Sequence, residues 1–208
     1  MAKITELIPT NTLAAIKDHL IKSSQKSERR WSSVKDEEDS VTGDFCGQLS
    51  TDWTKFSELD HIKGRWRINY RKFGSRRNSL EPKTGADGIF QIAIFNSNGK
   101  NIYRKEILFQ AKKEPIKNKG DLLEQIEKMN NYTSEIGNAV FIYGENGYFG
   151  MTGETYLENP ENRNFDKLHS IGRFLADEFI ECNVGVEDLY FRVLEDKLKL
   201  FKSFVRHS

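Results

Sequence analysis

Residues 85–112 read GADGIFQIAIFNSNGKNIYRKEILFQAK and place two apolar runs on either side of a short polar segment. Both runs, Ile89–Phe95 and Ile102–Lys112, are rich in β-branched and aromatic residues, which predicts two strands. The Asn98-Gly99 pair between them is typical of a two-residue hairpin turn, which requires positive φ at both positions. The stretch therefore predicts a β-hairpin at the centre of the fold.

The expected register of this hairpin brings polar side chains together. If Asn98 and Gly99 occupy the turn, Ser97 pairs with Lys100, and counting outward puts Asp87 opposite Gln110. Directly opposed residues project from the same sheet face, with Cβ atoms about 4.5–5.5 Å apart. Two residues further on, Lys112 shares that face. A bulge in either strand would shift this pairing.

A carboxylate, an amide carbonyl and an ammonium group in one place suit the hydrolysis of a phosphodiester. Oxygen ligands can hold Mg²⁺ or Mn²⁺, which polarises the phosphoryl oxygen and lowers the pKa of a bound water. A neighbouring lysine can orient or deprotonate that water, or stabilise charge developing on the phosphate. The alternative interpretation is that Asp87 caps a strand and Lys112 is a surface lysine.

Helical periodicity and further strand patterns surround the hairpin. Helices are expected over Thr10–Ser23, from about Ser27 into the acidic run Asp36–Asp39, over Gly120–Tyr132 and over Phe165–Ile180. Strands are expected over Ile62–Phe73 and Ala139–Tyr143, whereas Leu189–Phe204 fits either a helix or a strand followed by a helix. Since no repeat or linker divides the chain, we expect a single domain over residues 1–208, with a core at about 30–145 and a C-terminal helical extension at about 165–208.

Composition narrows the class of protein. The chain has 208 residues, of which 37% are hydrophobic, enough for a packed core. It contains neither an apolar run long enough to cross a bilayer nor a secretory leader, so we expect a soluble, cytoplasmic protein with no membrane contact. The two cysteines, Cys46 and Cys182, lie far apart and the four histidines lack metal-ligand spacing, which argues against a zinc site and favours reduced thiols.

The net charge of +1 gives no overall argument for a nucleic-acid partner, but the basic residues are clustered. Trp66, Ile68 and Tyr70 alternate with arginines, so one face of the expected strand is apolar and the other basic. Such a cluster can follow a phosphate backbone, although a solvated strand face explains it equally well. The candidate DNA-binding residues are Lys63, Arg65, Arg67, Arg71, Lys72, Arg76 and Arg77.

Gly85-Ala86-Asp87-Gly88, a hairpin and then Gln110-Ala111-Lys112 resemble the D…(D/E/Q)xK signature of the PD-(D/E)xK nuclease superfamily. The resemblance covers roughly residues 30–145, with a weaker match in FLADEFIECNVG, and is closest to nuclease modules of bacterial anti-phage defence systems. It implies an α/β fold of the restriction-endonuclease-like type, a mixed central β-sheet flanked by helices. It also implies Mg²⁺-dependent hydrolysis of DNA, and we expect a non-specific endonuclease.

Two residues depart from the family's pattern. Ala86 replaces the proline, which affects the shape of the loop, and Gln110 replaces the acidic residue, so that a neutral carbonyl stands where a negative charge is usual. The site then needs another carboxylate. The resemblance implies one on the preceding helix, for which Glu38 is the candidate, with Glu37 and Asp39 turned to other faces.

The resemblance thus implies a catalytic set of Glu38, Asp87, Gln110 and Lys112, in which the first three hold the metal. Lys113 is expected to contact phosphate.

Gln125 and Tyr132 lie seven apart on the next expected helix and resemble the glutamine and tyrosine of exonuclease-like members, which makes them possible auxiliary residues. Alternatively Met129, between them, marks a partly buried face on which Gln125 only makes local hydrogen bonds.

The remaining length has no room for a sensor, so activation would come from a separate regulatory subunit, from homo-oligomerisation or from a region outside this sequence. Two alternatives stay open: a non-catalytic DNA-binding or assembly subunit of a defence complex, which Gln110 favours, and a sequence-specific restriction endonuclease.

Overall fold

A single mixed sheet organises the molecule in the computed structural model, which describes residues 4–58, 62–74, 79–133, 135–158, 169–181 and 183–195. Its seven strands follow chain order from β1 to β7. They are β1 (Thr54–Glu58), β2 (Ile62–Lys72), β3 (Gly88–Asn96), β4 (Asn101–Lys113), β5 (Asn138–Gly144), β6 (Gly147–Thr152) and β7 (His169–Ser170). The pair β4–β5 is parallel and the other neighbours are antiparallel. The predicted mixed α/β fold is therefore confirmed.

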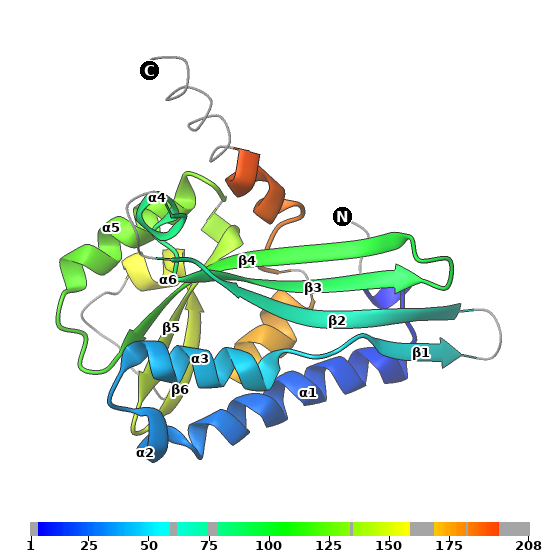
Figure 1. Cartoon of the computed structure of the whole chain (residues 1–208), viewed down its shortest axis with the longest axis horizontal. Helices are drawn as coiled ribbons and strands as arrows, with labels where there is room; N and C mark the ends of the chain where they lie inside the picture. The colour runs from blue at the N-terminus through cyan, green and yellow to red at the C-terminus, as the bar shows by residue number, and fades with distance from the viewer. Residues whose placement is uncertain are drawn as a thin grey trace.

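Helices lie on both faces of this sheet (Figure 1). The α-helices are α1 (Thr10–Glu28), α2 (Trp31–Val34), α3 (Glu38–Leu49), α4 (Glu81–Thr84), α5 (Lys119–Asn130), α6 (Gly153–Glu158) and α7 (Ile171–Arg173). Two short 3-10 helices, η1 (Ile4–Glu6) and η2 (Glu135–Gly137), precede α1 and β5, and the π-helix η4 (Phe174–Phe179) follows α7. Helix α5 lies in the crossover between the two parallel strands, a connection that such a pair requires. None of the described helices is long and apolar enough to cross a membrane.

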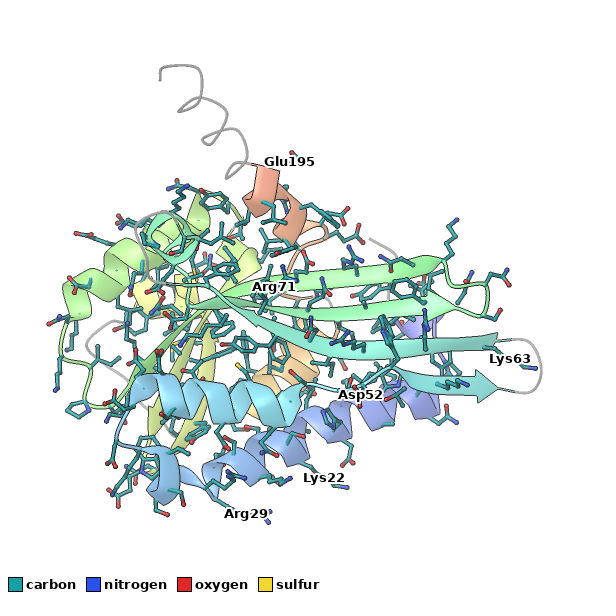
Figure 2. All side chains as sticks on the ribbon, in the orientation of Figure 1. Lys22, Arg29, Asp52, Lys63, Arg71 and Glu195 are labelled. Carbon is teal, nitrogen blue, oxygen red and sulfur yellow. The ribbon has the colours of Figure 1, made fainter. Side chains whose placement is uncertain are left out.

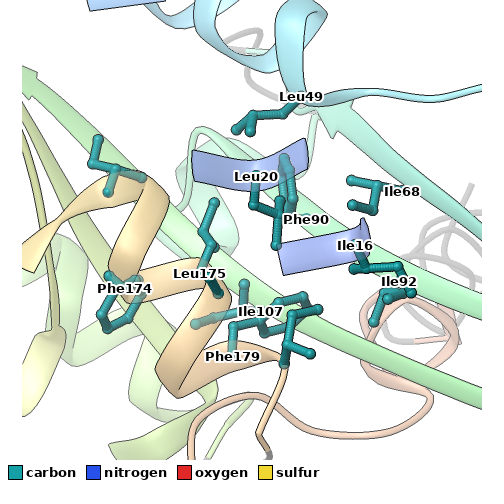
Figure 3. Close-up of a cluster of buried hydrophobic side chains, with 14 of the residues drawn as sticks. Ile16, Leu20, Leu49, Ile68, Phe90, Ile92, Ile107, Phe174, Leu175 and Phe179 are labelled. Atoms are coloured by element: carbon teal, nitrogen blue, oxygen red, sulfur yellow. The ribbon is translucent and has the colours of Figure 1, made fainter. Parts of the chain in front are cut away.

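The larger core lies between the sheet and the layer of α1, α3 and η4 (Figure 3). Helix α1 contributes Ile16 and Leu20 at the spacing of one helical face, and both are fully buried. They meet Ile92 and Ile107 from the sheet, because alternate residues of a strand point to the same side. Phe179 closes this core from η4. The N-terminal helix and the residues after 170 thus share one hydrophobic core.

A second core covers the opposite face of the sheet near the parallel strands. Leu108 and Val140 face Leu122 and Ile126 of α5, and all four side chains are fully buried. This layer leaves the distal part of β1–β3 uncovered, and those strands extend beyond the helices in Figure 1. Because both faces of β5 are packed, all seven of its residues are buried, as the apolar run AVFIY predicts.

The hairpin turn differs from the predicted two-residue turn. Gly99 has φ of +76°, but Asn98 does not adopt positive φ. The N–H of Gly99 donates to the carbonyl of Asn96 at 3.0 Å, and the N–H of Asn96 donates to the carbonyl of Lys100 at 3.0 Å, so the loop contains three residues. The Asn96 side chain stabilises it by accepting hydrogen bonds from the N–H groups of Asn98 and Lys100 at 3.1 and 2.9 Å.

A bulge then restores the predicted register. Ile94 pairs with Tyr103, whereas Phe95 pairs with Asn101, so Ile102 is an extra residue in β4. The Asn101 side chain accepts a hydrogen bond from the N–H of Tyr103 at 3.2 Å across this bulge. The longer loop and the bulge shift the pairing in opposite directions, and the last pair, Gly88 with Phe109, is the one expected from a two-residue turn.

Most predicted elements are present, with differences at their ends. Helix α1 runs to Glu28, and α5 ends at Asn130, so Tyr132 lies beyond it. The acidic run does not end a helix that starts near Ser27; it leads into α3, which begins at Glu38. Patterning did not predict the body of α3 or the strands β1, β6 and β7. Residues 189–195 are helical, whereas the first part of the helix expected over 165–180 lies outside the described residues.

Candidate active site

Strand β4 extends beyond the point where its neighbour β3 begins, and the candidate site lies beside this unpaired edge of β4. The last pair between them is Gly88 with Phe109, while β4 continues to Lys113 alongside β5 only. The N–H groups of Ala111 and Lys113 therefore meet carboxylates in place of a strand. The N–H of Ala111 donates to Asp87 Oδ2 at 2.7 Å, and the N–H of Lys113 donates to Glu38 Oε2 at 2.8 Å. Two acidic side chains from distant parts of the chain are thereby fixed beside one strand.

The predicted juxtaposition of Asp87 and Gln110 is confirmed. Gln110 Nε2 donates a hydrogen bond to Asp87 Oδ1 at 3.0 Å. The Gln110 side chain is only 1% exposed, yet its Oε1 atom has no hydrogen-bond partner among the described residues. A buried carbonyl oxygen without a donor is rare in proteins and indicates a missing partner, such as a cation or a water.

Glu38 begins α3, with Asp39 beside it in the first turn of the helix. Acidic residues are favoured there because unpaired N–H groups give the helix N-terminus a partial positive charge. The two side chains diverge, as expected from helix geometry. Glu38 Oε1 lies 3.7 Å from Lys112 Nζ, whereas Asp39 pairs with Lys72 at 2.7 Å.

These side chains line a pocket of about 560 Å³. Its lining consists of Glu38, Asp39, Lys72, Phe73, Gly74, Ser79, Glu81, Asp87, Gln110, Lys112 and Gln125. Four of these residues are acidic and two are lysines, so the pocket attracts cations before it attracts a phosphate. A second hollow of about 470 Å³ shares Glu38, Lys112 and Gln125 with it and continues toward Lys117 and the start of α5. The shared residues lie where the two hollows meet.

Burial raises the pKa of Asp87 to about 6. The N–H of Ala111 and the ammonium group of Lys112 lower this pKa, while the carboxylates of Glu38 and Glu81 raise it further. Burial also raises the pKa of Glu81, with Asp39 adding to the effect. Carboxylates that repel one another in a pocket are stabilised by a shared cation.

Glu81 was not among the predicted site residues. It lies on α4, for which sequence patterning predicted no helix, and this helix ends at Gly85 with φ of +71°. The only sequence signal was that Glu81 is the single acid in a basic stretch and lies six residues before Asp87. Periodicity could not place it, because a four-residue helix is too short to show a pattern.

Gln125 and Tyr132 have different positions. Gln125 lines both hollows, and its Oε1 atom has no hydrogen-bond partner within the described part of the chain. Tyr132 lines neither hollow and packs against the second core. The structure thus brings Gln125, but not Tyr132, to the site.

The predicted DNA-binding residues do not form one surface. Lys72 lines the pocket, while Arg71, one residue earlier, points to the other side of β2 and lies over the Tyr190 ring at 4.4 Å. Arg65 and Arg67 lie further along β2, and Lys63 is at its distal end (Figure 2). Arg76 and Arg77 lie outside the described residues.

A phosphate contact was predicted for Lys113, but its ammonium group binds to backbone carbonyls of the protein. Lys113 Nζ donates to the carbonyls of Lys35 and Asp36 at 2.6 and 3.0 Å. These bonds tie β4 to the segment before α3 and so help to position Glu38.

The side chains of the pocket suit a hard divalent cation only if the oxygens of its two glutamine amides bind the ion together with the carboxylates. Within the described ranges, no group of three or more His, Cys, Asp and Glu side chains is arranged to hold a metal ion. Asp87 and Glu38 supply two carboxylates, and the Oε1 atoms of Gln110 and Gln125 are buried and lack partners. Mg²⁺ commonly binds to one or two carboxylates together with neutral oxygens and waters, so these residues are compatible with it.

No family model matches the chain, and no characterised protein matches its sequence. The nuclease resemblance therefore stays a prediction.

Proposed function

We propose that this protein is a Mg²⁺-dependent nuclease, with Mn²⁺ as a possible substitute, that hydrolyses phosphodiester bonds of DNA. The observation that carries the proposal is the Oε1 atom of Gln110, which is buried and has no hydrogen-bond partner in the part of the chain that the structure describes. Gln110 lies beside Asp87 and lines the pocket that Glu38 and Lys112 also line. An acidic pocket with an unused carbonyl oxygen and a lysine suits a metal-assisted attack on phosphate.

In this proposal Asp87, Glu38 and Gln110 hold the metal, and Gln125 is a further oxygen donor. The bound ion supplies Lewis-acid polarisation of the phosphate and a lower pKa for the attacking water. The backbone N–H groups of Ala111 and Lys113 keep the two carboxylates in place, so that they need little reorganisation when substrate arrives.

Lys112 is the proposed catalytic lysine. Its side chain is 19% exposed, so its ammonium group reaches the pocket while its stem is packed. There it can orient the attacking water by a hydrogen bond and balance the charge that develops on the phosphate. Its 3.7 Å approach to Glu38 keeps it beside the proposed metal ligands.

The test is cleavage of supercoiled and linear DNA and of RNA by the purified protein with Mg²⁺, Mn²⁺ or EDTA. We expect DNA cleavage with either metal, none in EDTA, and a loss of about 10²–10⁴-fold in rate for Lys112→Ala. The matched control is Lys22→Ala, which removes an exposed lysine of α1 that pairs only with Asp18 among the described residues. Equal activity of the Lys112→Ala variant would reject the proposed role.

Two alternatives have specific outcomes in the same assay. Among the described residues, no group of three or more His, Cys, Asp and Glu side chains is arranged to hold a metal ion, which favours a non-catalytic DNA-binding or assembly subunit that would bind DNA but leave it intact with either metal. A sequence-specific restriction endonuclease would produce defined fragments, whereas the non-specific endonuclease that we propose produces a smear.

A role as an anti-phage effector is part of the proposal, because the sequence resembles defence nucleases. It implies a separate sensor subunit or a homo-oligomer that controls cleavage. The cellular test compares toxicity of the wild type with that of Lys112→Ala under co-expression of neighbouring genes; equal toxicity would contradict an effector role that depends on cleavage.

A further inference from the structure

The exposed face of the sheet far from the pocket carries a second cationic site. We define the Trp53 face as Trp53, Lys55, Arg65, Arg67 and Phe95. Lys55, Arg65 and Phe95 stand opposite one another on β1, β2 and β3, and Arg67 is two residues from Arg65, so all four point away from the larger core, in which Trp66 and Ile94 are buried. Trp53, directly before β1, packs against Arg65, Arg67 and Phe95. The face lies beyond the layer of α4–α6, on the strands that extend outward in Figure 1.

Aromatic rings and guanidinium groups are interleaved on this face. The Arg65 guanidinium lies 4.9 Å from the Trp53 ring centre and 5.6 Å from that of Phe95, and Arg67 lies 5.9 Å from Trp53. Trp53 and Phe95 meet edge to face at 4.9 Å. The Trp53 side chain is nevertheless 38% exposed. These contacts hold flat groups in place while leaving part of their surface to solvent.

The positive charge of the face is not neutralised. Lys55 stands directly opposite Arg65, and like charges in that position destabilise a sheet. Arg67 stands opposite Ala93, which in turn stands opposite Arg104, so Arg104 lies on the same face two strands away. Over the described ranges, neither Arg65 nor Arg67 has a carboxylate within ion-pair distance. Positive charges held side by side without an ion-pair partner among the described residues favour an anionic partner.

A hollow beside the face also suits phosphate. It has a volume of about 610 Å³ and is lined by Lys55, Phe56, Lys63, Gly64, Arg65 and the loop 96–99. None of these lining residues is acidic, in contrast with the four acids of the pocket at Asp87. Phosphate can therefore bind here without a divalent cation.

We propose that the Trp53 face binds single-stranded nucleic acid. Bases stack on Trp53, while Lys55, Arg65 and Arg67 contact the phosphates. A duplex hides the faces of its bases, so a surface built for duplex phosphates alone gains nothing from an exposed tryptophan. Aromatic residues and arginine are also enriched at protein interfaces, but lysine is depleted there, so Lys55 opposite Arg65 favours a nucleic-acid partner over a protein.

This site is separate from the candidate active site. Arg65 and Lys72 are seven residues apart on β2, which corresponds to about 23 Å along a strand. Between them Tyr190 lies against Arg71. The inference therefore does not depend on catalysis, and either proposal can fail while the other holds.

The test is fluorescence anisotropy in EDTA, where metal-dependent cleavage is absent. Labelled 15-nucleotide dT and U strands and a 15-base-pair duplex are titrated with the wild type. We expect tighter binding of at least one single strand than of the duplex. We expect Trp53→Ala to weaken that binding by about 5- to 100-fold, since stacking contributes this much per base, and Trp53→Phe to retain most of it.

Arg65→Gln tests the phosphate contact separately. It should reduce the slope of log affinity against log salt by about 0.7 for a single strand, with little change in melting temperature. This variant decides the matter if Trp53→Ala does not fold. Arg29→Gln, at an exposed arginine at the end of α1 on the other side of the molecule (Figure 2), is the control and should leave binding unchanged.

Three results would overturn the inference. These are duplex affinity equal to or above that of both single strands, unchanged binding by the folded Trp53→Ala and Arg65→Gln variants, or an equal loss of binding in Arg29→Gln.

Discussion

Asp87 has a raised pKa, which favours its protonated form in the metal-free protein, whereas its proposed role as a metal ligand requires the ionised form. Burial raises its pKa from 3.8 to about 6, so the folded state holds a proton on Asp87 at pH values where the unfolded state has lost it. The free energy of unfolding therefore decreases as the pH rises from about 4 to about 6. At neutral pH the ionised Asp87 lowers stability.

We accordingly predict that Asp87→Asn stabilises the metal-free protein at pH 7 by about 1–3 kcal/mol, and that the difference vanishes below about pH 4. The asparagine can still accept the hydrogen bond from Ala111. Urea unfolding at several pH values in EDTA measures the effect. Lower stability of the variant at pH 7 would show that the hydrogen bonds to the carboxylate outweigh its burial.

Gln110 determines how strongly the pocket binds a cation in the proposed site. In Gln110→Glu a second carboxylate would stand within hydrogen-bond distance of Asp87, because Gln110 Nε2 is 3.0 Å from Asp87 Oδ1. We predict a less stable metal-free protein at pH 8, by about 1–3 kcal/mol, because one buried charge then lacks compensation. We also predict a larger increase in melting temperature on Mg²⁺ addition than in the wild type.

The matched variant is Gln110→Met, which keeps the length of the side chain but removes the carbonyl oxygen. It should show no stabilisation by Mg²⁺. If Mg²⁺ raises the melting temperature of all three proteins equally, the ion binds elsewhere.

At the level of single elements, a comparison of two glycines with positive φ distinguishes the cost of backbone strain from the cost of a steric clash. Gly99 in the hairpin loop has open space where a Cβ atom would lie. At Gly85, after α4, the added Cβ would lie 2.3 Å from the carbonyl oxygen of Gln125. Gly85 therefore sets how closely α4 approaches α5, and with it the position of Gln125 in the pocket.

We predict that Gly99→Ala costs about 1–2 kcal/mol, the usual penalty for the left-handed conformation, and leaves the proposed nuclease activity unchanged. Gly85→Ala should cost clearly more and also reduce activity, because α5 must move away from the site. Thermal unfolding combined with the cleavage assay measures both effects. Equal losses of stability in the two variants would contradict the steric argument.

The hairpin also shows how far sequence patterning reaches. The meeting of Asp87 and Gln110 was predictable, but the assumed turn was wrong in detail, and the register is correct because a bulge at Ile102 compensates for the longer loop. The loop depends on hydrogen bonds of the Asn96 side chain, and the bulge on Asn101. Strand periodicity does not encode such side-chain contacts.

Sequence patterns could not predict other parts of the two sites, for a different reason. Glu38 was chosen through the resemblance, and its contact with β4 spans 75 residues of sequence. Arg65 and Arg67 were predicted as a basic row, but their association with Trp53 depends on β1, which periodicity did not reveal. Contacts between distant elements require the topology, which a single sequence shows only through its strongest periodic segments.

Across the whole molecule, the buried Glu106 attaches the last described segment to the sheet. Its carboxylate accepts hydrogen bonds from the Gln91 side chain and from the N–H of Tyr190, the latter at 2.7 Å. Its backbone pairs with Val186 through two hydrogen bonds of 2.8 Å. The helical residues 189–195 are thereby held over the sheet between the candidate active site and the Trp53 face.

We predict that Glu106→Gln weakens this attachment, because a neutral amide is a poorer acceptor and only its carbonyl oxygen, not its NH₂ group, can accept from the two donors. The expected loss is about 1.5–3 kcal/mol, the usual contribution of hydrogen bonds to a charged group. In hydrogen exchange, the amides of residues 189–195 should lose protection while those of β3 and β4 keep theirs. If protection fell equally in the strands, Glu106 would support the whole sheet and the segment after Gly185 would not unfold as a separate unit.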